Sequence, residues 1–60
     1  MLDKEIYKKW LERWQNRAFS DAREIAWRLD NGDYLGAAKI EKEFNLAIER
    51  IEELKEKIND

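Results

Sequence analysis

Apolar residues recur at regular intervals through the second half of the chain. From Ala37 onward the spacing alternates between three and four, which is the heptad pattern of a helix that packs along one narrow stripe. The members of this stripe are Ala37, Ile40, Phe44, Ala47, Ile51, Leu54 and Ile58. The pattern predicts a helix over residues 34–59.

A similar stripe runs through the first half of the chain. One of its spacings, from Ala18 to Ala22, is four where a strict heptad has three. Asp3 is a suitable N-cap for a helix that starts at Lys4, so we expect a helix over residues 4–30. The apolar members are Tyr7, Leu11, Trp14, Ala18, Ala22, Ile25 and Leu29.

The segment Asn31-Gly32-Asp33 separates the two stripes. Gly32 can adopt the left-handed backbone that ends a helix, and Asp33 can cap the free N–H groups of the next one. A short connection of this kind predicts a tight corner between antiparallel helices. The expected fold class is therefore all-α, with a helical hairpin as the basic unit.

The register of this hairpin follows from residue numbers, because facing residues of antiparallel helices have a near-constant sum. Five pairs add to 65: Ile25 with Ile40, Ala18 with Ala47, Trp14 with Ile51, Leu11 with Leu54, and Tyr7 with Ile58. Two further expected pairs, Ala22 with Phe44 and Leu29 with Ala37, add to 66. Each of these two sets a small residue against a larger one.

A second architecture starts from Phe19-Ser20-Asp21. Asp21 and Glu24 have the spacing of a capping box, so a helix could start here after a kink or break, giving a monomeric three-helix bundle. The hairpin is the better prediction because the second helix keeps its heptads as far as Ile58. Its last apolar residues need Trp14, Leu11 and Tyr7 opposite them.

The composition sets limits on chemistry. The chain has 60 residues, which we take as a single helical domain over 1–60, and it contains no cysteine and no histidine. Without these residues, haem ligation, di-iron chemistry and thiolate metal sites lack their usual ligands, and no glycine-rich phosphate loop is present. We expect no enzymatic activity, no catalytic or metal site and no cofactor.

Charge and hydropathy bear on partners and on location. Charged residues make up 43% of the chain but the net charge is only −2, so no long-range field favours nucleic acid. We find no membrane-spanning apolar run and no targeting signal, and a soluble cytoplasmic protein without nucleic-acid or membrane partners is expected. The even Glu/Lys surface, with no proline, histidine or cysteine, also suits a designed protein.

The corner carries a short family resemblance. Gly32-Asp33-Tyr34 followed by Ala37-Ala38 resembles the corner of tetratricopeptide-type helix pairs. The same run is similar to the UVR hairpin, which mediates pairing between excision-repair subunits. The arginine of the UVR pattern is absent, because Ile40 and Glu41 follow Lys39. The resemblance covers about half a dozen positions, and we transfer no function from it.

Several large apolar residues lie outside the predicted stripes, which indicates an interface. We expect self-association as a homodimer into a coiled-coil-like four-helix bundle with a scaffolding role. In this arrangement the Ile6/Trp10 end of one chain covers the Phe19/Ala26/Leu35 end of another. The alternative is a monomeric protein-binding module with exposed aromatic anchors. The candidate interface residues are Ile6, Trp10, Phe19, Ala26, Trp27, Leu35, Ala38 and Leu46.

Overall fold

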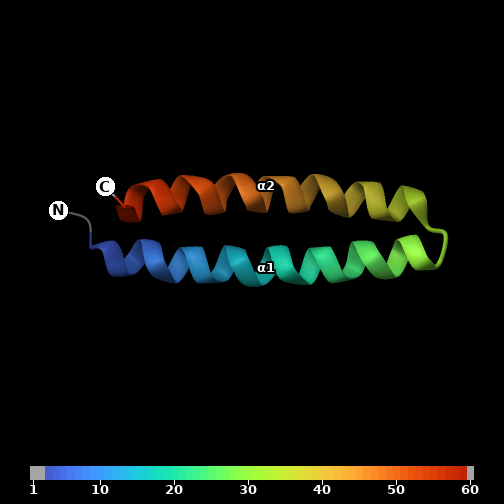
Figure 1. Cartoon of the computed structure of the whole chain (residues 1–60), viewed down its shortest axis with the longest axis horizontal. Helices are drawn as coiled ribbons and strands as arrows, with labels where there is room; N and C mark the ends of the chain where they lie inside the picture. The colour runs from blue at the N-terminus through green and yellow to red at the C-terminus, as the bar shows by residue number, and fades with distance from the viewer. Residues whose placement is uncertain (1–2, 60) are drawn as a thin grey trace.

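The protein is a hairpin of two long antiparallel helices (Figure 1). The computed structural model describes residues 3–59, with α1 over Lys4–Asp30 and α2 over Tyr34–Asn59. These bounds confirm the predicted hairpin and both helix ranges. The three-helix alternative is wrong, because α1 is continuous through Phe19–Asp21.

Local capping explains where α1 begins. A carboxylate oxygen of Asp3 accepts a hydrogen bond from the backbone N–H of Glu5 at 3.0 Å. This bond satisfies one of the donors that have no partner within the first turn of a helix. Glu5 adds negative charge near the positive end of the helix dipole, so both residues favour a helix start at this point.

The corner closes α1 with a Schellman motif. Gly32 has φ of 74°, in the left-handed region. Its N–H donates to the carbonyl of Leu29 at 3.1 Å, and the N–H of Asp33 donates to the carbonyl of Arg28 at 2.8 Å. The Asp33 carboxylate then accepts the N–H of Gly36 at 3.0 Å and so caps α2. The predicted roles of Gly32 and Asp33 are confirmed.

The two helices meet along a seam of mostly small side chains. Ala18, Ala47 and Ile51 form a buried cluster at its centre, with Leu11, Trp14 and Phe44 packed against it. Ala37 and Leu54 are buried further along the seam in each direction. Ala18 with Ala47 and Trp14 with Ile51, two of the pairs predicted to add to 65, lie in this one cluster, so the predicted register is correct through the middle of the hairpin.

The corner half of the seam differs from the prediction. Ala22 and Leu29 are exposed, whereas Asp21 is buried and Arg28 is half-buried. The inward positions of α1 therefore keep a strict heptad, and the constant sum of 65 places Asp21 opposite Phe44 and Arg28 opposite Ala37. The expected pairs Ala22–Phe44 and Leu29–Ala37 are wrong, because two helices packed in heptad register keep their contact stripe even where it meets polar residues.

The hairpin is long and thin. Its extents are 48 × 14 × 12 Å and its radius of gyration is 14.0 Å, against about 10 Å for a compact domain of this length. Its accessible surface is 5020 Å², whereas a folded monomer of this mass exposes about 4,200 Å². Across residues 3–59 no large side chain is fully buried, so the intramolecular core is small.

Candidate self-association surface

The seam divides the surface of the hairpin into two edges. Arg17 of α1 donates a hydrogen bond to Glu43 of α2, and this ion pair crosses from one helix to the other along one edge. Both residues immediately precede a seam residue, namely Ala18 and Phe44. In antiparallel heptads all residues that precede a seam residue share this edge, and all that follow one share the opposite edge. We call these the Arg17 edge and the Phe19 edge.

The Phe19 edge carries a second apolar stripe in the corner half of the molecule. The α1 residues again alternate in spacing between three and four, as the seam residues do. The stripe is continued across the seam by residues of α2, with Glu41 and Asn45 between them. Its members are Phe19, Ala22, Ala26 and Leu29 from α1, and Tyr34, Ala38 and Ile48 from α2.

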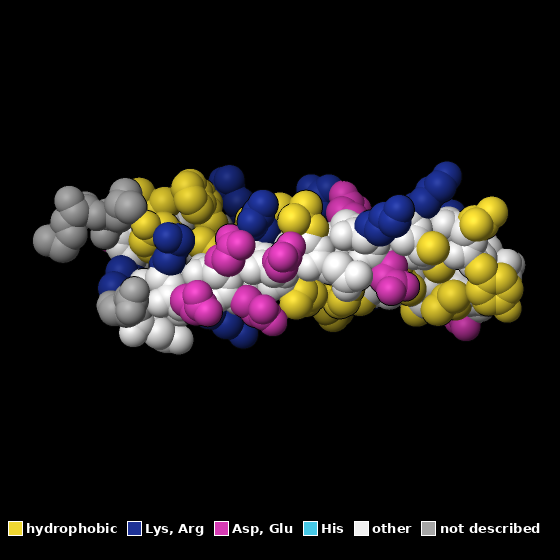
Figure 2. All heavy atoms as spheres, turned by 90° about the horizontal axis from the view of Figure 1, so that it is seen from above, with side chains coloured by type: hydrophobic (Ala, Val, Ile, Leu, Met, Phe, Trp, Pro, Cys, Tyr) yellow, Lys and Arg dark blue, Asp and Glu magenta, His cyan; other side chains and the backbone are white. Residues whose placement is uncertain are grey.

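Among residues 3–59, no side chain covers this stripe. Phe19 is 67% exposed and Tyr34 is 70% exposed, and Leu29 and Ile48 are also exposed. Toward the chain ends the same edge becomes charged, with Lys8 and Glu12 on α1 and Glu52 and Lys55 on α2. Figure 2 shows hydrophobic side chains gathered along one edge in the corner half and along the opposite edge at the terminal end. The mainly apolar part of the Phe19 edge is thus a bounded patch.

The Arg17 edge holds a different apolar group near the chain ends. Trp10 is 49% exposed and packs edge-on against Tyr7, with ring centroids 6.3 Å apart and planes at 76°. Lys57 lies over the Tyr7 ring at 5.8 Å from its centroid, within the range of a cation–π interaction. The chain's own side chains therefore partly cover this end.

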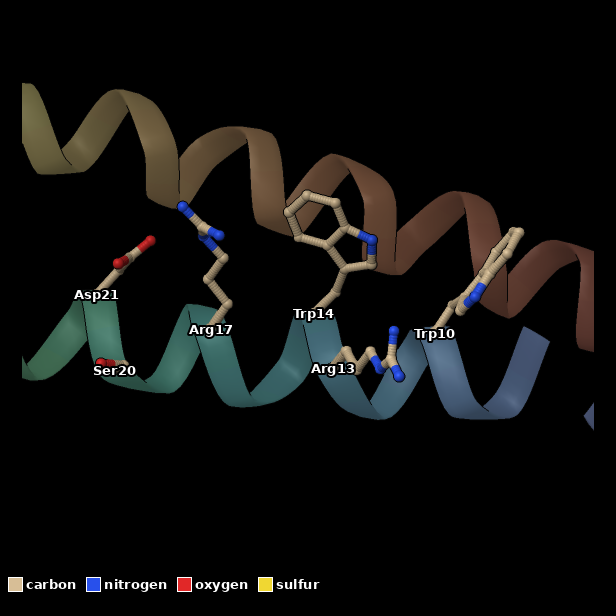
Figure 3. A pocket seen from close by; sticks show the side chains of 6 residues that line it. All are labelled: Trp10, Arg13, Trp14, Arg17, Ser20 and Asp21. Carbon is tan, nitrogen blue, oxygen red and sulfur yellow. The ribbon is translucent and has the colours of Figure 1, made fainter. Parts of the chain in front are cut away.

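A shallow groove follows the Arg17 edge from Trp10 toward the middle of the hairpin (Figure 3). Two tryptophans and two arginines contribute most of its wall, and Asp21 closes its far end. In Figure 3 the Arg17 and Asp21 side chains both extend toward α2. The lining residues are Trp10, Arg13, Trp14, Arg17, Ser20 and Asp21.

Asp21 is the polar residue that burial affects most in this groove. The residue is 7% exposed, and its Oδ2 atom has no hydrogen-bond partner within residues 3–59. Burial raises the pKa of Asp21, and the negative charge of Glu43 raises it further, while Arg17 acts in the opposite direction. The groove therefore ends in a carboxyl group for which ionisation is unfavourable.

The corner holds a second charged group, around Arg28. Its guanidinium donates to Asp33 at 2.6 Å and to Glu24 at 3.0 Å. The Gly36 N–H bond and the Arg28 bond lower the pKa of Asp33. A Cβ atom on Gly36 would collide with the Asp33 carboxylate and lie 2.8 Å from Nη1 of Arg28. The absence of a side chain at Gly36 therefore leaves room for this ion pair.

All eight residues predicted from the sequence as interface are exposed, but they do not form one surface. Phe19, Ala26 and Ala38 lie on the Phe19 edge. Leu35 is 81% exposed and lies on the outer face of α2, away from the seam. The remaining four lie on the Arg17 edge: Ile6, Trp10, Trp27 and Leu46.

Sequence reasoning missed four members of the Phe19 edge, namely Ala22, Leu29, Tyr34 and Ile48. Ala22 and Leu29 were assigned to the seam because they are apolar. A strict heptad runs through Asp21 and Arg28, and this spacing would have assigned Ala22 and Leu29 to the edge. Once they are moved, Phe19, Ala22, Ala26 and Leu29 are recognisable as a second heptad stripe.

The two helices show no feature of a metal site or of a membrane span. Within residues 3–59 no group of three or more acidic side chains is placed to hold a metal ion. Neither α1 nor α2, over the same range, is long and apolar enough to cross a membrane.

Comparison with known proteins adds no relative. No family model matches the chain, and no curated protein and no solved structure is significantly similar to it.

Proposed function

We propose that this protein is a self-associating helical scaffold, in which two hairpins pair through their Phe19 edges to form a four-helix bundle. The observation that carries the proposal is the second apolar stripe. Phe19, which is 67% exposed, lies at the end of the stripe nearest the middle of the hairpin. An amphipathic helix normally has one apolar face, because one partner suffices to bury it. A second face at heptad spacing on α1 suits a second helical partner.

The accessible area supports a second copy as that partner. The hairpin exposes 5020 Å², which exceeds by about 800 Å² the surface of a compact monomer of its mass. A stable protein–protein interface of standard size buries about 800 Å² on each partner. Pairing of two hairpins would therefore bring the exposed surface of each chain to an ordinary value.

Symmetry decides which patches meet. A two-fold dimer uses the same patch on both chains. The Trp10 group and the Phe19 edge lie on opposite edges, so one two-fold contact does not cover both. We therefore propose that Phe19 edges face each other, in place of the end-to-end arrangement expected from sequence. The partial cover that Tyr7 and Lys57 give to the terminal apolar group also favours this choice.

Sedimentation equilibrium across a hundredfold range of concentration tests the proposal. We expect the mass of two chains for the natural sequence and of one chain for Ala26→Glu, with helical circular dichroism retained. Ala26 is exposed in the hairpin, so its replacement spares the seam. Ile48→Glu repeats the test from α2. Leu35→Glu is the matched control on the outer face and should keep the two-chain mass.

The outcomes separate the models. A single-chain mass for the natural sequence at every concentration would exclude self-association. A two-chain mass that persists in both Ala26→Glu and Ile48→Glu would show that the chains pair through another surface. Loss of the dimer in Leu35→Glu as well would indicate that added charge, wherever it is placed, prevents pairing.

A second candidate function is a monomeric protein-binding module. It is favoured by Trp27, which is 62% exposed on the Arg17 edge and would stay uncovered in the proposed dimer. Exposed aromatic residues commonly anchor protein partners. A Trp10→Phe, Trp14→Phe double variant leaves Trp27 as the only tryptophan. Red-shifted emission of this variant, together with a single-chain mass, would support the module over the scaffold.

A further inference from the structure

Asp21 lies in the seam between the two helices. The other seam residues of α1 are uncharged, except Arg28 at the corner. Asp21 faces Phe44 across the seam and is 7% exposed, and Oδ2 has no hydrogen-bond partner within the described chain. An ionised carboxylate in such a place lacks the hydration or the hydrogen bonds that would offset its burial. Asp21 is therefore poorly suited to remain a fixed negative charge.

The charged groups around Asp21 come from both helices. On α2 the neighbour is Glu43, and on α1 the neighbours are Arg17 and Glu24. Arg17 is the one cation of this group, and its guanidinium is bonded to Glu43. Two carboxylates thus act on Asp21 while the single cation is shared, so the surroundings favour a neutral Asp21.

The position of Glu43 offers a specific acceptor for a proton on Asp21. Glu43 directly precedes Phe44, which lies opposite Asp21 in the register, and its ion pair with Arg17 holds its carboxylate against the turn of α1 that precedes Asp21. A hydrogen bond between two carboxyl groups requires that one of them carries a proton. We propose that Asp21 and Glu43 form a proton-binding pair across the seam, and that uptake of one proton stabilises the hairpin against unfolding. Arg17 then holds the remaining negative charge of the pair on the Arg17 edge.

The direction of the effect follows from linkage. Burial and Glu43 hold the pKa of Asp21 above its ordinary value of 3.8 in the folded chain. The stabilising contribution of protonated Asp21 is thus complete below the unfolded pKa and is lost as pH rises through the folded pKa. The hairpin should become more stable as pH falls from neutrality toward the ordinary range of aspartate. Each unit of elevation corresponds to a tenfold change in the unfolding constant.

Urea unfolding of the full chain from about pH 7 to about pH 4 tests this inference. We expect the natural sequence to gain stability on acidification. Asparagine has the shape of a neutral aspartic acid. The Asp21→Asn variant should therefore be more stable than the unsubstituted chain at pH 7, and its free energy of unfolding should change less with pH. Glu43→Gln should reduce the pH response. Glu49→Gln, an exposed carboxylate outside the seam, is the matched control and should retain the natural profile.

Direct titration of the Asp21 carboxyl group tests the proposal even if a variant fails to fold. The side-chain carboxyl carbon of Asp21 is followed by NMR in the natural sequence. A midpoint above 3.8 that falls in Glu43→Gln supports the pair. A midpoint at or below 3.8 overturns it, as do parallel stability profiles for the natural sequence and Asp21→Asn.

Discussion

Ala47 packs against Ala18 at the midpoint of the hairpin, and Ala47 has no exposed surface at all. Each is the smallest side chain in its own seam cluster, so the two helices can come close to each other here. Larger residues, among them Trp14 and Phe44, pack on either side of this contact. The alanine pair therefore sets the spacing on which the rest of the seam depends.

Ala47→Leu should destabilise the hairpin by about 1–3 kcal/mol, because extra methylene groups in a well-packed contact force side chains or backbone to shift. Urea unfolding measures the change. Glu49→Leu introduces the same side chain at an exposed position of α2 and should have a much smaller effect. Equal losses in the two variants would contradict close packing at Ala47.

Gly32→Ala should cost about 1–2 kcal/mol, since an L-residue is strained in the left-handed conformation. The φ of Gly32 is 74°, and a Cβ atom there meets nothing within 4 Å, so the penalty comes from the backbone alone. Thermal unfolding provides the measurement. Gly32→Asn should lose less, because asparagine tolerates this conformation better than alanine. An unchanged melting temperature in Gly32→Ala would argue against the Schellman corner.

Asp33→Ala should lower the melting temperature more than Asp33→Asn does. Asparagine retains an oxygen that can accept the Gly36 N–H, whereas alanine removes the cap of α2. Asparagine loses only the charge that faces Arg28. If the two variants melt together above pH 5 or so, the charge matters and the cap does not.

The same residue predicts a loss of stability in strong acid. The Gly36 and Arg28 bonds hold the pKa of Asp33 below 3.8, so its contribution is present above that value and is lost as pH falls through the folded pKa. This window lies below the one in which Asp21 acts. Stability should accordingly pass through a maximum in mild acid, and Asp33→Asn should flatten the acidic limb of a melting profile.

Arg17→Gln should raise the pKa of Asp21, because Arg17 is the cation that opposes its elevation. NMR titration of the Asp21 carboxyl group is the measurement, with an upward shift of the midpoint expected. Arg13→Gln is the control. Arg13 lines the same groove but is not among the groups that act on Asp21, so its replacement should leave the midpoint in place.

The helices and the corner were predictable because they depend on local rules. Heptad spacing marked both helices, and Gly32 followed by Asp33 marked the turn between them. The corner half of the seam was not predictable by the same means, because we chose the stripe by hydrophobicity and Ala22 is more apolar than Asp21. Helix geometry instead places Asp21 inward, where burial is tolerated at the expense of an unpaired oxygen.

The candidate surface depended on that choice. Residues on either side of the seam can be sorted into edges only when the seam is correct, so the assignment of Leu29 to the core hid its place beside Tyr34 on the Phe19 edge. The role of Gly36 was missed for a related reason. It depends on Arg28 facing the corner and pairing with Asp33, and an arginine in the seam is not suggested by an apolar pattern.

The start of α1 at Lys4 and the end of α2 at Asn59 lie at one end of the hairpin, and the Gly32 corner lies at the other (Figure 1). A mechanical load applied between Lys4 and Asn59 would act across the seam and not along it. The pairs would part in sequence, first Tyr7 from Ile58 and last the residues beside the corner. A single hairpin should thus unfold pair by pair at low force. Pairing of the Phe19 edges with a second copy would add resistance chiefly when the corner half separates.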